Sequence, residues 1–461
     1  MGNVYDWTPA IIGRFDSIMK ASRYNILIPL TSGQTLLFNS ATVALAEIDP
    51  VDLSDVKCVL AEPESERSPH QEEIFQILCD GKFLVPAEID ELAAMTTRNR
   101  LQRFGGDTLF LTIAPTLGCN FACPYCFESK NSSSHMDAEA ERALLEFARS
   151  RVQGTKQILV TWFGGEPTLC LDLIERVQTA LQRLAHEKSI SLLPASMVTN
   201  GYLMDRAAAR RLKDLDIKDI QITLDGPRES HDKRRILVGG GPTFDHIIAN
   251  IESALDLLQI TIRMNIDRSN ANAAVALAHE LNARGILDNA NLYFAPIADA
   301  GGSCSDVKGL CLAPAAFSQL QVEIYRRLQR DGIDHMEYPM LAPGGHCGAD
   351  SDNSFVISPS GDLFKCWEEI SLDRSHSIGS IFFPDRSPRQ QANKDRYLAW
   401  DPISMPTCQR CNILPLCMGG CPRQSLNKER IRRGACCSWK YNLSEMLAIR
   451  HHSERRKEVT S

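Results

Sequence analysis

The sequence predicts an α/β protein built around a parallel sheet. Between residues 109 and 297, six short apolar runs alternate with amphipathic helical patterns. Apolar and charged residues make up 44% and 23% of the chain, as in ordinary globular proteins. Strands separated by helices pair in parallel, because each helix returns the chain to the edge from which it started. The pattern is compatible with an open doubly wound sheet and with a partial barrel. The runs are Leu109–Ala114, Ile158–Trp162, Ala195–Thr199, Ile220–Leu224, Ile260–Ile266 and Leu292–Ile297, and the helices are Glu139–Arg149, Leu171–Ala185, Arg206–Leu215, Phe244–Leu258 and Asn272–Ala283.

Ahead of this zone, the sequence predicts a small α+β unit of winged-helix type. A polar turn, Thr31-Ser32-Gly33, joins two strand-like runs, as a short hairpin loop requires. The predicted elements are the strands Tyr24–Leu30 and Gln34–Phe38, helices at Ser54–Leu60 and His70–Leu78, a short strand at Gly81–Pro86 and a helix at Ile89–Met95. We place this unit at residues 1–105 and the alternating zone at residues 106–312.

The third zone, residues 313–461, begins with a predicted helix at Phe317–Gln329 and then loses the alternation. Its clearest element is a predicted hairpin formed by Phe355–Ile357 and Leu363–Cys366. The remainder is rich in loops and cysteines, as expected where metal centres replace a large apolar core. We expect the charged tail from Arg450 onward to be solvent-exposed and mobile.

Charge and hydropathy exclude several classes of protein. The chain has 50 basic and 57 acidic residues and a net charge of −7, whereas a general nucleic-acid binder carries a basic excess. No apolar stretch reaches the roughly 18 residues that a membrane span needs, and no secretory signal is visible. We therefore expect a cytoplasmic protein without nucleic-acid or membrane partners.

The cysteines are clustered. Three of the 16 lie between Cys119 and Cys126, and eight lie between Cys347 and Cys437. A reducing cytosol keeps thiols unpaired, so this clustering indicates metal or redox chemistry rather than disulfides.

The first cluster, Cys119, Cys123 and Cys126, has the spacing C-x3-C-x2-C and directly follows the first predicted strand. A 4Fe-4S cluster normally takes four thiolates, so three leave one iron open to another ligand. Zinc needs a fourth ligand, and none lies at ligand spacing nearby. The remaining alternative is three structural thiols in one loop.

This motif resembles that of the radical SAM superfamily. The resemblance implies a partial (β/α)6 barrel whose open iron binds S-adenosylmethionine, and cleavage of that cofactor to a radical that abstracts hydrogen from a substrate. Polar residues and glycines at successive strand ends support it, since the carboxyl ends of parallel strands carry the active site. The resemblance implies cofactor contacts by Tyr125, Gly164, Gly165, Glu166, Thr199, Asn200, Thr223, Asp225 and Arg263.

The later cysteines resemble the SPASM extension of radical SAM peptide-modifying enzymes. The resemblance assigns Cys347, Cys366 and Cys421 to a first auxiliary 4Fe-4S cluster, and Cys408, Cys411, Cys417 and Cys436 to a second. The fourth position of the first cluster is open or taken by Cys304, Cys311 or Cys437, and Cys437 also remains an alternative to Cys436. A pair of structural zinc sites is the other interpretation.

Two departures separate the chain from the related sulfatase-maturing enzymes. Those enzymes have a further cysteine shortly before the one that matches Cys347 and an aspartate directly after the one that matches Cys366. Here no cysteine shortly precedes Cys347, and Trp367 follows Cys366. The presumed proton acceptor is therefore absent, which disfavours sulfatase maturation.

The N-terminal unit resembles the leader-recognition modules of enzymes that modify ribosomally made peptides. Such modules bind a leader peptide as an added strand. A structural cap on the barrel is the alternative. The sequence thus predicts a peptide maturase with three 4Fe-4S clusters, S-adenosylmethionine, a precursor peptide and an external electron donor of flavodoxin or ferredoxin type. Its product would be a thioether, or a carbon–carbon or cyclophane link. Formylglycine formation and a non-catalytic zinc-ribbon scaffold are the competing hypotheses.

Overall fold

The computed structural model describes residues 18–126, 128, 134–297, 309–334, 347–370, 373–426 and 436–460. Cys304, one of the alternative cluster ligands, lies outside the described residues.

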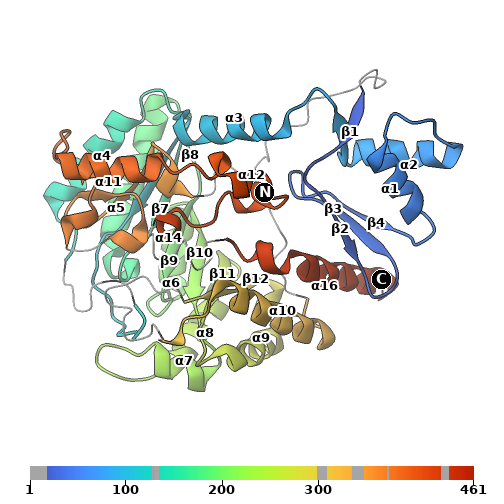
Figure 1. Cartoon of the computed structure of the whole chain (residues 1–461). Helices are drawn as coiled ribbons and strands as arrows, with labels where there is room; N and C mark the ends of the chain where they lie inside the picture. Colours follow the sequence, from blue (N-terminus) through green and yellow to red (C-terminus); the bar gives the residue numbers. More distant parts are fainter. Residues whose placement is uncertain are drawn as a thin grey trace.

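The centre of the molecule is a mainly parallel sheet, as predicted (Figure 1). The parallel strands lie in the order β12-β11-β10-β9-β7-β6, which is the reverse of their order along the chain. A doubly wound sheet reverses direction at a switch point, whereas a barrel adds its strands in sequence, so the doubly wound alternative was wrong. The strands are β6 (Thr108–Ile113), β7 (Gln157–Trp162), β9 (Ala195–Thr199), β10 (Ile217–Thr223), β11 (Gln259–Ile266) and β12 (Ala290–Pro296).

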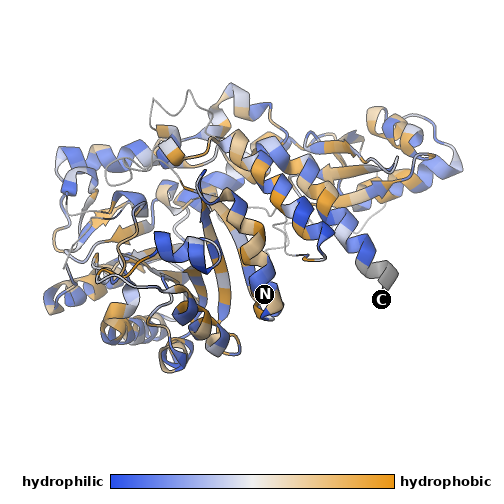
Figure 2. Cartoon of the chain, turned by 90° about the horizontal axis from the view of Figure 1, so that it is seen from below, coloured by the Kyte–Doolittle hydropathy of each residue, from blue (hydrophilic) through white to orange (hydrophobic). Residues whose placement is uncertain are grey.

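Helices cover one face of this sheet, and alternate strand residues are buried against them (Figure 2). At the end of β7, for example, buried Trp162 donates a hydrogen bond to Gln178 of α5 over 3.2 Å. The strand side chains that point to the opposite face of the sheet, such as Thr161, are only partly buried and more often polar. That second face is therefore available for a ligand. The helices are α4 (Ala138–Arg151), α5 (Leu171–Lys188), α6 (Arg206–Asp214), α7 (Arg228–Arg234), α8 (Phe244–Ala254) and α9 (Ala274–Ala283).

The C-terminal zone extends the same sheet. The predicted hairpin forms β13 (Ser354–Ile357) and β14 (Asp362–Phe364), and β15 (Gly379–Ser380) pairs with β14. β13 also pairs in parallel with β6, which the sequence did not predict because no local pattern records a partner so far away. The short β8 (Ser191–Leu192) pairs with β7.

The N-terminal unit contains two small sheets, one with strand order β2-β3-β4 and one made of β1 and β5. The predicted hairpin is confirmed as β2 and β3, and helix α3 runs from this unit to β6 (Figure 1). α3 is longer than predicted. The elements are β1 (Met19–Ala21), β2 (Asn25–Pro29), β3 (Thr35–Asn39), β4 (Leu45–Ile48), α1 (Leu53–Ala61), α2 (Pro69–Asp80), β5 (Leu84–Pro86) and α3 (Glu91–Phe104).

The β2-β3 hairpin packs on the cysteine-rich C-terminal zone. Leu36 and Phe38 of β3, both fully buried, share an apolar cluster with Leu416, Leu443 and Leu447. Two side-chain hydrogen bonds, from Arg23 to the Gln409 carbonyl and from Ser40 to the Asn412 carbonyl, join the same regions. The C-terminal helices are α10 (Pro314–Arg330), α11 (Pro388–Leu398), α12 (Pro406–Gln409), α13 (Leu414–Cys417), α14 (Pro422–Leu426) and α16 (Trp439–Thr460).

The prediction of a mobile tail from Arg450 was wrong. The tail continues helix α16, and His451 and Arg455 form ion pairs with Glu47 of β4 over 3.2 and 3.1 Å. Arg456 donates to the Gln329 carbonyl at the end of α10 over 3.0 Å. The charge pattern of the tail therefore serves packing against β4 and α10 rather than solvation alone.

Candidate active site

The three clustered thiols lie in the loop that leaves the carboxyl end of β6. Cys123 is buried, and Cys119 and Cys126 are half-buried. Backbone hydrogen bonds fix the loop against the segment after α7: Ala122 N donates to Ile236 O over 2.8 Å, and Val238 N donates to Asn120 O over 2.9 Å. The spacing of the cysteines is thus held by a segment more than a hundred residues later in the chain.

Gly164 and Gly165, directly after β7, bring a second loop against the start of the cysteine loop. Gly165 N donates to Thr116 O over 3.0 Å, and Glu166 N donates to Gly118 O over 2.9 Å. A Cβ atom on Gly165 would lie 2.2 Å from the Gly118 oxygen, and one on Gly164 would lie 2.3 Å from the Thr116 oxygen. Both positions therefore require glycine on steric grounds, and Gly164 also has a φ of +122°.

The carboxylate of Glu166 is fully buried and links the ends of β7 and β9. Its Oε1 accepts hydrogen bonds from Thr168 N over 3.0 Å, Thr168 Oγ1 over 2.5 Å and Thr199 Oγ1 over 2.6 Å. Its Oε2 accepts one from Asn200 N over 2.7 Å and keeps further acceptor capacity. Asn200 in turn donates to Asn120 in the cysteine loop over 2.7 Å. Glu166, Thr199 and Asn200 thus meet as the strand order predicts.

A buried polar network joins Tyr125 to the end of β10. The Tyr125 hydroxyl donates to the fully buried carboxylate of Asp225, which also accepts from Arg234 Nε over 3.3 Å and from Asn265 N over 3.2 Å. Arg235 donates to the same hydroxyl over 2.8 Å. Sequence reasoning missed Arg234 and Arg235. Their only signal was a pair of basic residues following a strand-end turn.

Thr223 and Arg263 lie side by side on the open face of the sheet, because they are paired in the register of β10 and β11. Tyr293 of β12 continues the row and accepts from Arg263 over 3.4 Å. Arg263 also donates to Asn265 over 2.8 Å. A threonine hydroxyl and a guanidinium are thus presented together on that face.

The chemistry of the donor set fits an iron–sulfur cluster. Burial, and next the charge of Glu166 for Cys119 and of Glu128 for Cys126, raise the pKa of these two thiols to about 12. Glu128 is itself buried, its Oε2 has no hydrogen-bond partner, and burial and then Glu166 raise its pKa to about 8. Three sulfur donors and two carboxylates thus lie together in a buried place, and such groups suit the binding of positively charged iron. Bound iron would instead lower the pKa of the three thiols, since it binds them as thiolates.

Comparison with known proteins decides the nature of this domain. Residues 113–270 match the family model of the radical SAM superfamily, and this range contains all three clustered thiols and every predicted cofactor contact. The chain carries a radical SAM domain. Residues 113–270 thus resemble the domain in which radical SAM enzymes bind S-adenosylmethionine and an iron–sulfur cluster.

Individual relatives of the radical SAM domain differ in function. A probable GTP 3′,8-cyclase of Saccharolobus solfataricus is 31% identical over 176 residues, covering 38% of this chain and 53% of the cyclase. The chain thus spans about half the length of that relative. A serine-type anaerobic sulfatase-maturating enzyme of Klebsiella aerogenes is 24% identical over 324 residues, covering 66% of this chain and 77% of that enzyme. The solved structure of anSMEcpe with bound AdoMet shares the fold, with a TM-score of 0.58 and 18% identity over 75% of this chain and 96% of that one.

Outside the radical SAM domain, the late cysteines form two groups. Cys347, Cys366 and Cys421 are close enough to interact electrostatically: burial mainly raises the pKa of Cys347 to about 11, and Cys421 contributes. The pKa of Cys366 is raised by burial and, more weakly, by Cys347. Cys408, Cys411, Cys417 and Cys436 are likewise electrostatic neighbours. The assignment of these thiols to two clusters stays a prediction.

Cys436 and Cys437 both lie in the second group but differ in burial. Cys436 is exposed, whereas Cys437 is half-buried and lies beside Cys417, and this neighbour is the main cause that lowers the pKa of Cys417. Lys440 Nζ lies 3.7 Å from the Cys411 sulfur. Among the described residues, no three His, Cys, Asp or Glu side chains converge as a single metal ion requires. A 4Fe-4S cluster binds each thiolate at a different iron, so it needs sulfurs gathered around a volume rather than around a point.

Trp367 connects the first late group to the radical SAM domain. It directly follows Cys366, and its ring stacks on Phe163, the residue before Gly164, with centroids 5.1 Å apart and planes 14° apart. The ring of Trp367 remains 43% exposed. The stacked pair thus joins the residue after Cys366 to the end of β7, where the loop of Gly164 and Gly165 begins.

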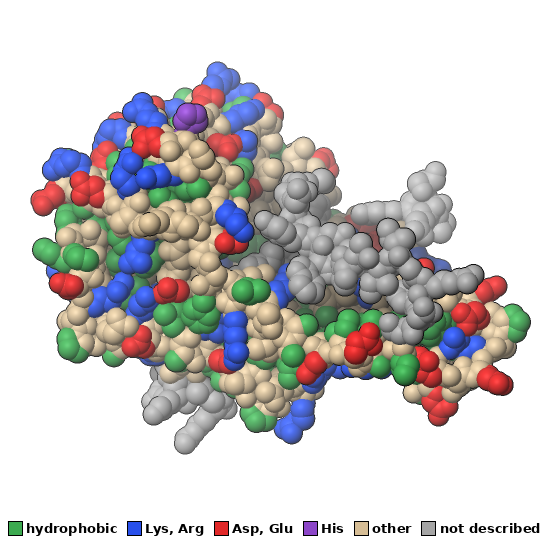
Figure 3. Space-filling model, turned by 90° about the horizontal axis from the view of Figure 1, so that it is seen from above, with side chains coloured by type: hydrophobic (Ala, Val, Ile, Leu, Met, Phe, Trp, Pro, Cys, Tyr) green, Lys and Arg blue, Asp and Glu red, His purple; other side chains and the backbone are tan. Residues whose placement is uncertain are grey.

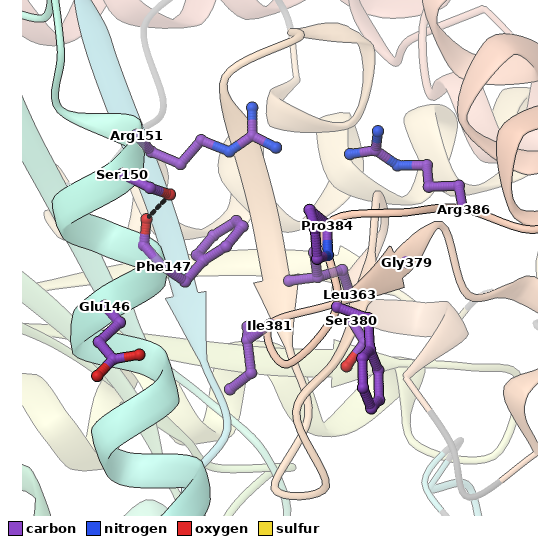
Figure 4. A pocket seen from close by; sticks show the side chains of 11 residues that line it. Glu146, Phe147, Ser150, Arg151, Leu363, Gly379, Ser380, Ile381, Pro384 and Arg386 are labelled. Atoms are coloured by element: carbon purple, nitrogen blue, oxygen red, sulfur yellow. Dashed lines mark hydrogen bonds between the residues drawn. The ribbon is translucent and has the colours of Figure 1, made fainter.

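A separate hollow of about 300 Å³ lies between α4 and the β14–β15 region (Figure 4). Arg151 and Arg386 extend toward each other across it, above Leu363 and Ile381. None of the predicted site residues lines it.

Charges of both signs are interspersed over the face of the molecule shown in Figure 3. No described helix is long and apolar enough to cross a membrane.

Proposed function

We propose that this radical SAM enzyme modifies a ribosomally made precursor peptide by hydrogen abstraction and forms a cross-link within it. The link would be a thioether, or a carbon–carbon or cyclophane bond. The observation that carries the proposal is the position of Trp367 directly after Cys366, stacked on the loop of Gly164 and Gly165. That place holds an aromatic ring rather than a carboxylate that could accept a substrate proton.

The residues of the radical SAM domain take the following roles in this proposal. Cys119, Cys123 and Cys126 would hold the cluster, which together with S-adenosylmethionine supplies a one-electron cleavage that yields a hydrogen-abstracting radical. The free acceptor capacity of Glu166 Oε2 and the backbone of Gly164 and Gly165 suit the cofactor ammonium. The remaining contacts would be Thr223 and Arg263 with the cofactor carboxylate, Tyr125 and its partner Asp225 with the adenine, and Thr199 and Asn200 with other parts of the cofactor.

The two late groups of thiols support two auxiliary 4Fe-4S clusters, which would bring the total to three. Removal of two hydrogen atoms from a peptide releases two electrons, and an auxiliary cluster would receive the second. We assign Cys347, Cys366 and Cys421 to the first auxiliary cluster. Cys408, Cys411, Cys417 and one of the pair Cys436 and Cys437 take the second, and the thiol contact with Cys417 favours Cys437. A flavodoxin- or ferredoxin-type protein would supply the initial electron.

The N-terminal unit, residues 1–105, would bind the leader of the precursor. Among the described residues, β2 and β4 each pair on one side only, so either edge offers unpaired backbone groups to an added strand. Leu27 of β2 is 38% exposed. The β2-β3 hairpin also packs on the region of Cys417, so a peptide held there would begin close to the cysteine-rich zone.

Formylglycine formation on a sulfatase is the second candidate. The Klebsiella aerogenes relative, which covers 66% of this chain, favours it. Both candidates act on a polypeptide with the same cofactor, and they differ in the fate of the substrate carbon. In a cross-link the carbon forms a new bond to a second residue, and in formylglycine it becomes an aldehyde.

A product assay separates the two. The anaerobically reconstituted enzyme is incubated with S-adenosylmethionine, reductant and either a short peptide encoded beside its gene or a serine- or cysteine-containing sulfatase peptide. Cross-linking and serine oxidation both remove two hydrogens, so intact mass alone does not decide. Trapping with a hydrazide labels only an aldehyde, and fragmentation within a ring is suppressed only in a cross-linked peptide. A hydrazide adduct on the sulfatase peptide, with the neighbouring peptide unchanged, would replace our proposal with the second candidate.

A further inference from the structure

Arg235 is a buried cation beside the three-thiol loop, and none of the roles above uses it. It directly follows α7 and is 9% exposed. Its guanidinium donates to the Tyr125 hydroxyl over 2.8 Å and lies 5.6 Å from the centre of the Phe121 ring. Both contacts belong to the loop from Cys119 to Cys126. The buried Nε–H has no hydrogen-bond partner in the described structure.

The backbone of Arg235 is fixed on both sides. Its N–H donates to His231 O over 2.8 Å, and its carbonyl accepts from Thr243 Oγ1 over 2.6 Å. The next residue, Ile236, accepts the hydrogen bond from Ala122 of the cysteine loop. The position of the guanidinium relative to the thiols is therefore set by the same contacts that shape the loop.

Arg235 makes no direct ion pair among the described residues and is linked to a carboxylate through the Tyr125 hydroxyl, which accepts from Arg235 and donates to Asp225. Its neighbour Arg234 is paired with Asp225 and Asp267, over 3.3 and 2.9 Å, whereas no ion pair of Arg235 is found in the described part of the chain. A buried cation without a partner is strongly unfavourable. Its guanidinium contacts the loop at Tyr125, directly before Cys126, and at Phe121, between Cys119 and Cys123, so a positive charge lies beside the loop that carries the three thiols.

We propose that Arg235 supplies the fixed counter-charge of the cluster bound by Cys119, Cys123 and Cys126, and thereby raises the midpoint reduction potential of that cluster. Reduction adds one negative charge to the cluster. A fixed cation beside it stabilises the reduced form more than the oxidised form. Arg235 is thus a residue that tunes the cluster rather than a catalytic residue. The inference rests on the radical SAM domain and is independent of the product formed.

The test is a potentiometric titration followed by electron paramagnetic resonance on the holoenzyme. The signal titrated is the one that changes when S-adenosylmethionine is added, because Cys119, Cys123 and Cys126 lie in the radical SAM domain together with the predicted cofactor contacts. At the wild-type midpoint, we expect Arg235→Met to lower the ratio of reduced to oxidised cluster about tenfold, equivalent to about 59 mV for one electron. Arg235→Lys keeps the charge and should change the ratio less than about threefold. Arg176→Met, which removes a charge from the exposed side of α5, should leave it unchanged.

Iron and sulfide content and circular dichroism accompany each titration. If Arg235→Met loses the cluster, Arg235→Gln replaces it, and iron retained by Arg235→Lys but lost by both neutral variants supports the counter-charge. A neutral variant that keeps its iron and the wild-type midpoint overturns the inference while leaving the enzyme assignment intact. Absence of any signal that responds to S-adenosylmethionine in the wild type would overturn both.

Discussion

The two cysteine-rich regions of the molecule are built in different ways. The loop of Cys119, Cys123 and Cys126 is fixed by hydrogen bonds to the loop after β7, whose glycines permit the close approach, and to the segment after α7. In the second late group, Cys411, Cys417 and Cys437 lie on short helices and loops that share an apolar cluster with the N-terminal hairpin. The first region therefore depends on the order of strands in the sheet, and the second depends on the docking of a separate unit. Substitutions in one region should therefore affect its own iron and leave the iron of the other region in place.

The largest effect should come from the thiols themselves. Replacing Cys119, Cys123 and Cys126 with alanine should abolish reductive cleavage of S-adenosylmethionine and lower the iron content from about twelve to about eight per chain. The Cys408→Ala/Cys411→Ala variant should instead keep the cleavage and lose product formation. Iron and sulfide analysis with Mössbauer spectra, together with detection of 5′-deoxyadenosine, checks both. About four irons in the wild type and none in the triple variant, with zinc making up the rest, would show that only one region holds iron.

Gly165→Ala tests whether backbone approach builds the first region. The new Cβ would lie 2.2 Å from the Gly118 oxygen, so we expect the protein to lose about 2 kcal/mol or more of stability together with most cofactor cleavage. Gly239→Ala is the matched control, because a Cβ there meets nothing within 4 Å. Urea denaturation and 5′-deoxyadenosine formation are the measurements. Equal behaviour of the two variants would contradict the steric argument.

Phe38→Ala addresses the second region. Phe38 is fully buried in the cluster shared with Leu416 and Leu447, so its truncation should cost about 3–5 kcal/mol of docking and packing energy. We expect iron loss from the second late group of thiols, while the signal that responds to S-adenosylmethionine persists. Leu27→Ala, at a partly exposed position of the neighbouring strand, is the control. Loss of both classes of iron together would show that the regions are not independent.

The smallest effect concerns pH and the first region. His231 is buried, and burial and then Arg235 hold its pKa well below the usual value. Only the unfolded chain then takes up a proton near pH 6.5, so stability falls as pH decreases through that value. At pH 5.5 the wild type should have lost about 1.4 kcal/mol through this residue, and His231→Gln should lack that loss. Denaturation midpoints of the wild type and of His231→Gln between pH 5.5 and 7.5 measure this loss. If the stability of both proteins depended on pH in the same way, His231 would not be buried in its neutral form.

Local patterns in the sequence predicted the parallel strands and the helices between them. They also placed Glu166, Thr199 and Asn200 at neighbouring strand ends, because the parallel order follows from the alternation. Pairing between β13 and β6 could not be predicted, since it joins segments with no shared local signal. Arg235 was missed because its importance comes from burial beside the thiols. The tail was misjudged because its charges pair with Glu47, a contact that only the folded chain creates.

The pairing of β13 with β6 has a consequence for synthesis. Ser354 pairs opposite Phe110, so the strand that precedes the cysteine loop lacks one neighbour until about 240 further residues have been made. At about 5–20 residues per second, that interval lasts roughly 10–50 s. Throughout it, the nascent chain exposes an unsatisfied strand edge, a known template for aggregation. The yield of soluble protein should therefore depend on how fast the ribosome reaches the C-terminal zone.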